Sequence, residues 1–324
     1  MVRIWTVVLM AGLGMANGCA KAVESDWEKR AAERLREPDP SQLARIEAAQ
    51  PEQARVNPLK ERRLLVFWRC EGYIHTSIPW ANAAMRAMAD RTGAFEVDFA
   101  DQYAVFEAAN LARYDALLFN NTTHLVFPEE SMQQAILEFI QSGKGVVGLH
   151  AATDNFYEWE AGAQMMGGQF CGHPWTADGT WAFRLNDPKH TLNQAFGGEG
   201  FRYQDEIYQY DPATWQGEAV LRLLVSLDFT DPATAARLTD PRFANYNDRY
   251  GSAEREVPVS WVRRLGEGRL FNTNFGHREE TYTHAPIMRH LLDGIQYALG
   301  DLPADERPTT HQHVAQGDGA THQH

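Results

Sequence analysis

Short apolar runs alternate with longer amphipathic segments in the first half of the chain. Residues 79–92 and 128–142, and a shorter stretch at 104–112, repeat apolar positions with the spacing of a helix. The apolar runs between them are typical of strands buried on both faces of a sheet, and they lie at residues 63–68, 95–99, 116–119 and 145–149. This alternation predicts right-handed crossovers and a parallel sheet with helices on both faces.

After residue 150 the pattern changes, because strand-like runs follow one another with few helical segments between them. Gly266 and Gly268 flank the turn of a hairpin between the last two runs, and residues 285–299 predict a closing amphipathic helix. The expected strands are 181–185, 203–210, 220–228, 259–264 and 269–274. The predicted fold class is therefore α/β: a flavodoxin-like, doubly wound, mostly parallel sheet with added β-rich excursions in the second half.

The N-terminal residues have the pattern of an export signal. Arg3 precedes an apolar stretch at residues 4–16, which is too short to span a bilayer as a stable helix. Small residues precede Cys19, as in a bacterial lipobox, so lipidation of Cys19 and simple cleavage are two alternatives. We expect residues 1–18 to be a signal peptide, and the mature protein to be exported, either periplasmic or lipid-anchored to a bacterial membrane.

Two polar segments flank the predicted domain at residues 62–300. Residues 19–61 are charged, Ala-rich and interrupted by proline, which predicts a solvated linker with fragments of helix. Residues 301–324 are polar and contain the motif Thr-His-Gln-His twice, which predicts a disordered, histidine-containing tail.

Composition and charge narrow the range of partners. With 44% hydrophobic residues the chain can bury a substantial core. The formal net charge of −13 argues against nucleic acid, which needs an excess of Lys and Arg to neutralise its phosphates. It also argues against an anionic membrane surface, so we expect membrane contact only through an N-terminal lipid anchor.

Ionisable and polar side chains follow the predicted strands at the edge where open parallel sheets bind ligands. Asn121 and Thr122 follow the third strand, and further candidates lie in the second half of the chain. The predicted site depends on five side chains coming together at this edge: His75, His150, His173, Glu206 and His277. Imidazoles beside a carboxylate predict acid–base chemistry or metal binding at one rim of the sheet.

His150 ends the fourth strand in the segment Gly145–Val146–Val147–Gly148–Leu149–His150. This layout resembles that of class I glutamine amidotransferases, which carry a cysteine at the corresponding place. An imidazole moves protons or binds a metal, but it does not replace a thiolate that must form a stable acyl intermediate. Glutamine amidotransfer is therefore not expected.

Several further sequence blocks follow one another along residues 62–300: GYIH (72–75), FNNT (119–122), GVVGLHAAT (145–153), GGQFCGHP (167–174), DEIY (205–208), PVSW (258–261) and GRLFNTNFGH (268–277). In the composition and order of these blocks, the chain is similar to the ThuA-like, or trehalose utilisation, family, within the class I glutamine amidotransferase-like superfamily. Val257 departs from the pattern, because the family often has a histidine just before the Pro-x-x-Trp block.

The resemblance implies a role in disaccharide breakdown, in routes where a partner dehydrogenase makes 3-keto sugars. A 3-keto group acidifies the neighbouring C–H bond, so a positioned base can drive elimination, hydration or isomerisation. The resemblance implies that His150 is the base or acid and that Glu206 orients it or carries a second proton. His277 and His173 would polarise the carbonyl, directly or through a divalent ion such as zinc.

The resemblance also implies a set of substrate-binding residues, with Asn121 and Thr122 holding sugar hydroxyls. Trp159 is a candidate for stacking on a pyranose ring, although a tryptophan in the core is the other reading. The chain contains no His-x-x-x-His or Cys-x-x-Cys spacing, so the identity of a metal stays open. The substrate-binding candidates are His75, Asn121, Thr122, Trp159 and His173, and the metal candidates are His150, His173 and His277.

Two alternatives to an enzyme follow from the same residues. One is a sugar-binding module that keeps the pocket without the chemistry, which the change at Val257 favours. The other is an accessory subunit of a sugar dehydrogenase. A module that only binds needs no ionisable cluster, so activity that depends on pH near neutrality distinguishes the enzyme from it.

Overall fold

The computed structural model describes residues 18–245 and 256–310 of the 324-residue chain. The expected signal peptide at 1–18 therefore lies outside the described residues except for Gly18, and so does the tail from residue 311. Among the helices that are described, none combines the length and apolar composition needed to cross a membrane.

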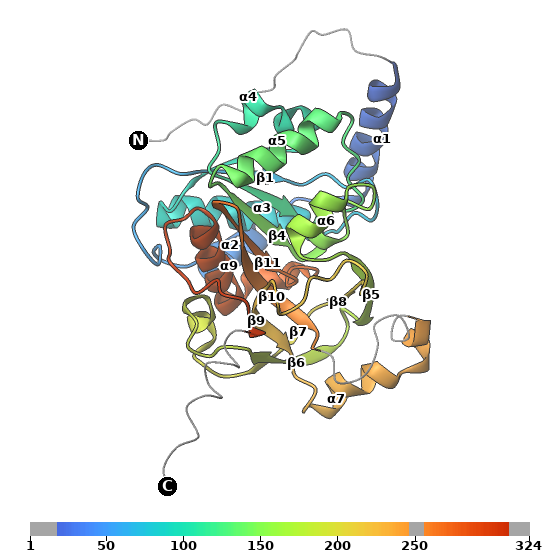
Figure 1. The fold of residues 1–324 in the computed structure, drawn as a ribbon, viewed down its shortest axis with the longest axis vertical. Coiled ribbons are helices and arrows are strands. Elements are labelled where there is room, and N and C mark those ends of the chain that lie inside the picture. The colour runs from blue at the N-terminus through green and yellow to red at the C-terminus, as the bar shows by residue number, and fades with distance from the viewer. Residues whose placement is uncertain (1–17, 246–255, 311–324) are drawn as a thin grey trace.

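A mixed nine-stranded sheet forms the centre of the molecule (Figure 1). Its strands and those of a small second sheet are β1 (Arg63–Phe67), β2 (Glu96–Ala100), β3 (Ala116–Asn120), β4 (Gly145–Leu149), β5 (Phe170–Trp175), β6 (Thr180–Leu185), β7 (Phe201–Gln204), β8 (Ile207–Tyr210), β9 (Arg222–Leu227), β10 (Pro258–Leu265) and β11 (Gly268–Thr273). The strand order of the large sheet is β2-β1-β3-β4-β11-β10-β9-β6-β7. Strands β2, β1, β3, β4 and β11 are parallel, and the remaining pairs are antiparallel. The parallel half has the flavodoxin-like order, so the predicted fold class is confirmed.

Helices cover both faces of the parallel half. The helices of the described residues are α1 (Gly18–Arg34), α2 (Pro40–Ala49), α3 (Ile78–Thr92), α4 (Ala108–Leu111), α5 (Glu130–Gln141), α6 (Glu160–Met166), α7 (Pro232–Ala235) and α9 (Ala285–Ala298). Helices α2, α3 and α9 pack on one face, whereas α4 and α5 pack together on the other (Figure 1). The buried side of α5 carries Met132, Ala135, Ile136 and Phe139, which are spaced three and four positions apart as an amphipathic helix requires.

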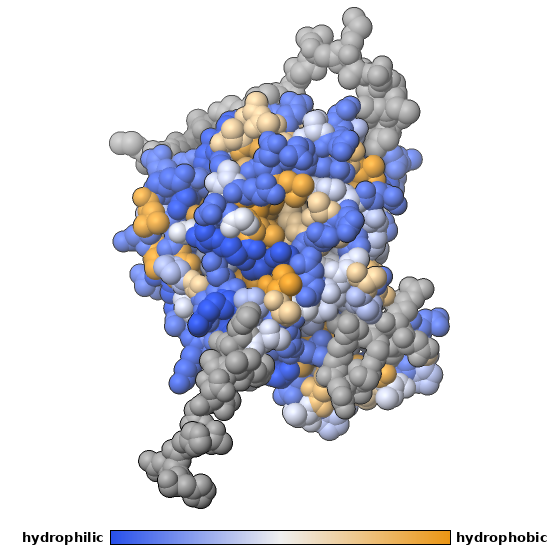
Figure 2. All heavy atoms as spheres, in the orientation of Figure 1, coloured by the Kyte–Doolittle hydropathy of each residue, from blue (hydrophilic) through white to orange (hydrophobic). Residues whose placement is uncertain are grey.

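The core lies between the sheet and these helices. Every residue of β3 and β4 is buried, which explains why their sequences are continuous apolar runs rather than alternating ones. Each large apolar side chain buried there stabilises the fold by about 1.5–3 kcal/mol. The face seen in Figure 2 is mostly hydrophilic, with apolar residues in small separate patches.

The expectation of a solvated linker at residues 19–61 is wrong for the described part of that segment. Trp27 in α1 is fully buried, and its ring N–H donates a hydrogen bond to Asp101 at 3.0 Å. Ile46 in α2 is also fully buried. Pro40 occupies the first turn of α2, and the Asp39 carboxylate caps the helix. This proline starts a helix, a position that suits its fixed φ, rather than interrupting one.

The predicted single strand at 203–210 is two strands that belong to different sheets. Strand β7 pairs with β6 in the large sheet, whereas β8 pairs with β5 in the two-stranded sheet. The break falls at Asp205 and Glu206, where the Asp205 side chain accepts a hydrogen bond from the Glu206 backbone N–H at 3.0 Å. Residues 170–175, which were not among the expected strands, form the partner strand β5.

The expectation of disorder from residue 301 is wrong for the first ten residues of the tail. The buried Asp301 carboxylate forms an ion pair with Arg62 at 2.6 Å. The Thr309 hydroxyl accepts a hydrogen bond from the backbone N–H of Leu223 at 2.8 Å. These contacts fix the start of the tail to the domain.

Candidate functional site

Three histidines and one glutamate from four distant segments meet beyond the carboxyl ends of the parallel strands. His75 follows β1, His150 follows β4, Glu206 lies between β7 and β8, and His277 follows β11. One potential ligand atom of each lies within 4.8 Å of the corresponding atoms of the other three. We call these four residues the His–Glu cluster. Its position is the one at which open α/β sheets bind ligands.

The cluster is compact on the side of Glu206. The Nδ1 atom of His277 lies 2.9 Å from Oε2 of Glu206 and 3.2 Å from Nε2 of His150. The same His150 nitrogen lies 3.6 Å from Glu206 Oε2. The His75 ring stands edge-on to the other two imidazoles, with centroid distances of 4.9 Å to His150 and 5.2 Å to His277.

The backbone and one hydrogen bond fix the orientation of His150. Its φ angle of 49° is in the left-handed region, so the chain turns sharply directly after β4. Its Nδ1 atom lies 2.8 Å from the carbonyl oxygen of Asn274. A carbonyl oxygen only accepts, so Nδ1 carries the proton and Nε2 presents its lone pair to Glu206 and His277.

Asp205, next to Glu206, ties the site together. Its fully buried carboxylate accepts hydrogen bonds from the backbone N–H groups of Gly276 at 2.8 Å and Arg278 at 3.1 Å. It also accepts from the hydroxyl of Thr281 at 3.0 Å. Burial raises the pKa of Asp205 above its ordinary value, against the opposing effect of nearby His150 and of these hydrogen bonds. Asp205 therefore holds the loop that carries His277 beside Glu206.

Gly276 is required where that loop passes closest to its neighbours. Its φ angle is 130°, and a Cβ atom there would lie 2.7 Å from the hydroxyl of Tyr282. The Gly276 carbonyl accepts hydrogen bonds from Ser77 at 2.8 Å and from Tyr282 at 3.0 Å. A side chain at this position would push His277 out of the cluster.

Burial and the contacts between neighbouring side chains shift the pKa values of residues in the cluster. Burial would raise the pKa of Glu206, but the adjacent imidazoles of His150 and His277 outweigh it and hold this pKa below its ordinary value. Burial would lower the pKa of His277, but the hydrogen bond and charge of Glu206 outweigh it and raise this pKa. Burial lowers the pKa of His75 well below its ordinary value, and the nearby His150 and His277 lower it further. The proton therefore rests on the His277–Glu206 pair, and His75 is neutral.

His173 connects the cluster to solvent. It lies in β5 with its side chain 40% exposed, and its Nδ1 atom is 3.2 Å from Oε1 of Glu206. This is the oxygen that faces away from His277, whose side chain is 23% exposed. The Phe170 ring stacks on His173 at 5.9 Å between centroids. Of the predicted rim residues, His173 and His277 are thus the two with the most exposed side chains.

The N-terminal helix holds the loop that supplies His75. Arg30 donates a hydrogen bond to the carbonyl of Gly72 at 2.5 Å, and Arg34 donates to the carbonyl of Ile74 at 3.2 Å. Helix α1 therefore braces the segment directly before His75, at the edge of the domain (Figure 1). The sequence alone does not reveal this contact, because a charged helix has the same composition whether it is solvated or docked through its arginines.

Asn121 and Thr122 are close to the site but fully buried. The Asn121 amide donates hydrogen bonds to the side-chain oxygen of Asn120 at 2.9 Å and to the hydroxyl of Tyr282 at 3.1 Å. The Thr122 hydroxyl accepts a hydrogen bond from Asn155 at 2.9 Å. These hydrogen bonds brace the loops around the site.

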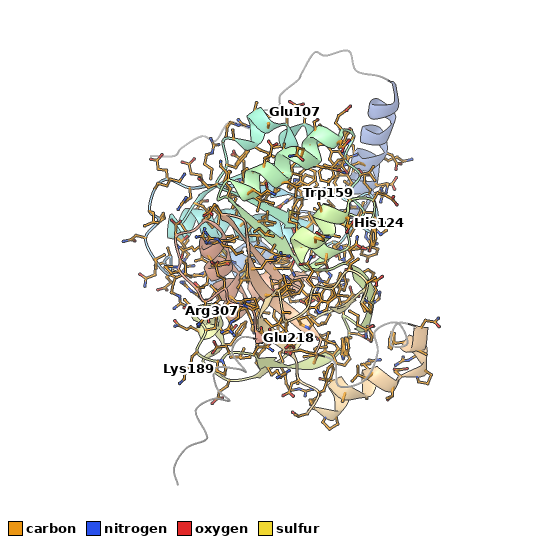
Figure 3. The ribbon with its side chains drawn as sticks, viewed as in Figure 1. Glu107, His124, Trp159, Lys189, Glu218 and Arg307 are labelled. Carbon is orange, nitrogen blue, oxygen red and sulfur yellow. The ribbon has the colours of Figure 1, made fainter. Side chains whose placement is uncertain are left out.

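Trp159 is set apart from the cluster. It is buried and packs edge-on against Phe127 and Phe156, with centroid distances of 5.4 and 5.2 Å. Figure 3 shows it inward of His124, which lies at the edge of the domain. The expectation that Trp159 stacks on a sugar is corrected by this packing, because its ring belongs to the hydrophobic core.

The group that can hold a metal differs from the expected one. Among the described residues, the set with suitable spacing is His75, His150, Glu206 and His277. His150 and His277 were expected ligands, whereas His173 is outside this set and contacts the other oxygen of Glu206. Val257 is fully buried in the apolar core, so the position where the family often has a histidine supplies no ligand here.

Comparison with known proteins shows the family to which this chain belongs. A family model described as "Trehalose utilisation" (ThuA) matches residues 63–298. The crystal structure of a putative ThuA-like protein from Bacteroides uniformis is 17% identical, with a TM-score of 0.55, and the match covers 75% of this chain and 94% of that one. A putative ThuA-like protein from Parabacteroides merdae is 18% identical, with a TM-score of 0.54 and coverage of 77% and 94%. Both show the fold alone, and none of the curated proteins matches. The family match, which suggests a carbohydrate-related role, spans most of the sequence, so this chain belongs to the ThuA, or trehalose utilisation, family.

Proposed function

We propose that this protein is an enzyme of carbohydrate metabolism that moves protons on a disaccharide or 3-keto-glycoside at the His–Glu cluster. The observation that carries the proposal is the 2.9 Å contact between His277 Nδ1 and Glu206. This pair holds a proton in a largely buried site, and the side chain of His277 still reaches solvent. A buried imidazole–carboxylate pair with opposed pKa shifts is typical of acid–base catalysis.

Among the possible reactions, elimination from a 3-keto-glycoside fits this set of proton-carrying side chains best. The base removes the proton from C2, next to the carbonyl, and the C2–H electrons form a C1–C2 double bond. The C1–O bond breaks with its electron pair on the oxygen, which takes up one proton and leaves as an alcohol. No oxidant or reductant is consumed, so the site needs only a base and an acid.

The histidines differ in exposure, and we assign the roles of base and acid from this difference. His277 is partly exposed and lies against Glu206, so it is the proposed base once it has lost its proton. His173 is the proposed acid, because its side chain is 40% exposed and contacts the second Glu206 oxygen. His150 is fully buried, so we propose that it acts as a positioning residue through His277 and Glu206.

The proposal includes where the protein acts and what supplies its substrate. A 3-keto sugar must come from a reaction that oxidises the C3 hydroxyl, so we propose a sugar dehydrogenase as the partner that acts before this protein. The export pattern of residues 1–18 supports a location outside the cytoplasm. The histidine at position 150, in the place of the nucleophilic cysteine, supports a reaction other than amidotransfer.

The test is incubation of the purified protein with glucosides and with their 3-keto forms, followed by product analysis. We expect turnover of a keto form, and a decrease of at least about 100-fold in kcat for His277→Ala. His124→Asn is the matched control, because His124 lies outside the cluster at a positive φ that asparagine tolerates. Binding without turnover by the wild type would support the sugar-binding module, and unchanged kcat in His277→Ala would exclude the proposed base.

A further inference from the structure

We infer that the His–Glu cluster is a binding site for one divalent transition-metal ion, with His75, His150, His277 and Glu206 as ligands. This ligand set replaces the one expected from the sequence, because it includes His75 and Glu206 and excludes His173. The inference rests on the proposed function only for what the ion does during catalysis. The presence of the ion is a separate matter that is measured without a substrate.

The spacing of the atoms fits four-coordinate geometry. Tetrahedral ligands at zinc–nitrogen or zinc–oxygen bond lengths lie about 3.4 Å from one another. The three pairwise distances among His150 Nε2, His277 Nδ1 and Glu206 Oε2 are 2.9, 3.2 and 3.6 Å. These three atoms therefore surround a point that lies within bonding distance of each. A ring nitrogen of His75 lies within 4.8 Å of all three and is the fourth potential ligand atom.

The hydrogen bonds around the cluster prepare its atoms to bind an ion. The Asn274 carbonyl holds the proton of His150 on Nδ1, which leaves Nε2 free as a ligand. His173 contacts the Glu206 oxygen that faces away from the other ligands, and Asp205 accepts from the Glu206 backbone N–H. Metal-binding histidines and carboxylates are usually oriented by such outer hydrogen bonds.

His75 supplies an independent observation. It is only 3% exposed, yet its Nδ1 atom has no hydrogen-bond partner within the described part of the chain. Buried polar atoms in native proteins are nearly always paired, and an orphaned one often marks a missing ion or water. A hydrogen-bonded network of protons explains the close contacts of His277 with Glu206 and His150, but it gives His75 no reason to be buried beside them.

The donor set indicates which ions fit. Three imidazole nitrogens with one carboxylate suit zinc and its neighbours in the first transition row, whereas calcium and magnesium prefer all-oxygen sites. One carboxylate leaves a bound divalent ion with net positive charge. Such an ion would polarise the carbonyl of a keto sugar and so acidify the neighbouring C–H bond, as the proposed function needs. With the ion bound, His277 is a ligand, so the proton of that C–H bond would pass to His173, which stands outside the ligand set.

The experiment measures bound metal in the full-length protein. The tail contains His311, His313, His322 and His324, so all proteins carry glutamine at these positions. After chelation, Co²⁺ or Zn²⁺ is added, unbound ion is removed by gel filtration, and metal per chain is determined. We expect one equivalent, with the intense visible absorption of four-coordinate Co²⁺.

Variants test the ligand set. His75→Ala, His277→Ala and Glu206→Gln should each weaken Co²⁺ binding at least tenfold and change the visible spectrum. His173→Ala, which removes an outer contact of Glu206, should weaken Co²⁺ binding but keep the four-coordinate visible absorption. His124→Asn should leave both the affinity and the spectrum unchanged. Thermal unfolding by circular dichroism establishes that each variant is folded, and any unfolded alanine variant is replaced by the corresponding glutamine.

The outcomes separate this inference from the proposed function. Less than half an equivalent of metal in the wild type, or full binding by both His75→Ala and His277→Ala, would overturn the metal site. Turnover of a keto-glycoside by protein without bound metal would leave the proposed function standing and remove the ion from it. One equivalent of metal without turnover of any keto-glycoside would support the site and contradict the function.

Discussion

The buried carboxylate of Asp205 accepts a hydrogen bond from the backbone N–H of Gly276 at 2.8 Å. This contact joins the break between β7 and β8 to the loop after β11, which are 71 positions apart in the sequence. Glu206 and His277 are the next residues on the two sides of the contact. The geometry of the His277–Glu206 pair therefore depends on Asp205, although Asp205 is not a member of the His–Glu cluster.

Asp205→Asn should weaken both the site and the fold. The carboxylate accepts from three backbone N–H groups and one hydroxyl, whereas an asparagine turns an N–H₂ group toward some of these donors. We expect kcat on a keto-glycoside to decrease at least tenfold, and the free energy of unfolding to decrease by about 2–3 kcal/mol. Steady-state kinetics and urea unfolding of the same sample measure both. A folded variant with wild-type kcat would show that Asp205 does not position His277.

Gly276→Ala should disrupt the cluster through contact with Tyr282. The new Cβ would lie 2.7 Å from the Tyr282 hydroxyl, so the loop before His277 must move. Gly93→Ala is the matched control, because Gly93 also has a positive φ but a Cβ there meets nothing within 4 Å. We expect Gly93→Ala to lower the free energy of unfolding by about 1–2 kcal/mol with unchanged kcat. Equal effects of the two changes on kcat would contradict this explanation.

Arg34→Ala should loosen the loop that supplies His75. Arg34 donates to the Ile74 carbonyl at 3.2 Å and to the Tyr73 hydroxyl at 2.6 Å. Arg36 is the control, because its hydrogen bonds are made to carbonyls at the end of its own helix. We expect Arg34→Ala to reduce kcat several-fold and the free energy of unfolding by about 1–2 kcal/mol, and Arg36→Ala to leave kcat unchanged.

Hydrogen exchange provides the second readout for helix α1. In Arg34→Ala the amides of residues 71–75 should exchange faster, because their loop has lost part of its support. Unchanged exchange together with reduced kcat would mean that Arg34 acts on the site by another route.

The buried His290, which lies outside the His–Glu cluster, should make the free energy of unfolding depend on pH. Its Nδ1–H donates to the Leu192 carbonyl at 2.7 Å, its Nε2 accepts from Ser260 at 2.8 Å, and burial lowers its pKa to about 4. The unfolded chain takes up this proton first, so the stability that neutral His290 contributes is complete above pH 6.5 and is lost as the pH falls toward 4.

Urea unfolding measures this contribution. From about pH 7 to about pH 4, the free energy of unfolding should decrease by about 3 kcal/mol more in the wild type than in His290→Gln. Parallel pH dependences of the two proteins would show that His290 is not buried as a neutral imidazole.

The parallel half of the fold could be predicted because each of its strands is a continuous apolar run. The site residues His75, His150 and His277 could be singled out because each follows such a strand, and parallel strands end at a common edge. Glu206 was identified as a candidate although the break in its strand was not predicted. The break depends on a hydrogen bond made by Asp205, and no periodicity in the sequence records it.

Other features depend on packing between distant segments. The burial of Trp27 and the arginine contacts of α1 turn an expected linker into part of the site's support. Trp159 follows a loop in the sequence, but the neighbouring Phe127 and Phe156 enclose it in the core. Sequence spacing alone does not show which side of an exposed-looking segment meets the rest of the chain.

The most direct test of the account is a double-variant cycle on kcat with a keto-glycoside, using His277→Ala, Glu206→Gln and the combined variant. Residues that act as one catalytic unit lose their effect together, so the second change should add little to the first. We predict that each single variant has a kcat lower than that of the wild type by a factor of at least about 100. The kcat of the combined variant should be within about threefold of the kcat of the less active single variant. Losses that multiply, or wild-type turnover in either single variant, would contradict the claim that His277 and Glu206 form one reaction centre.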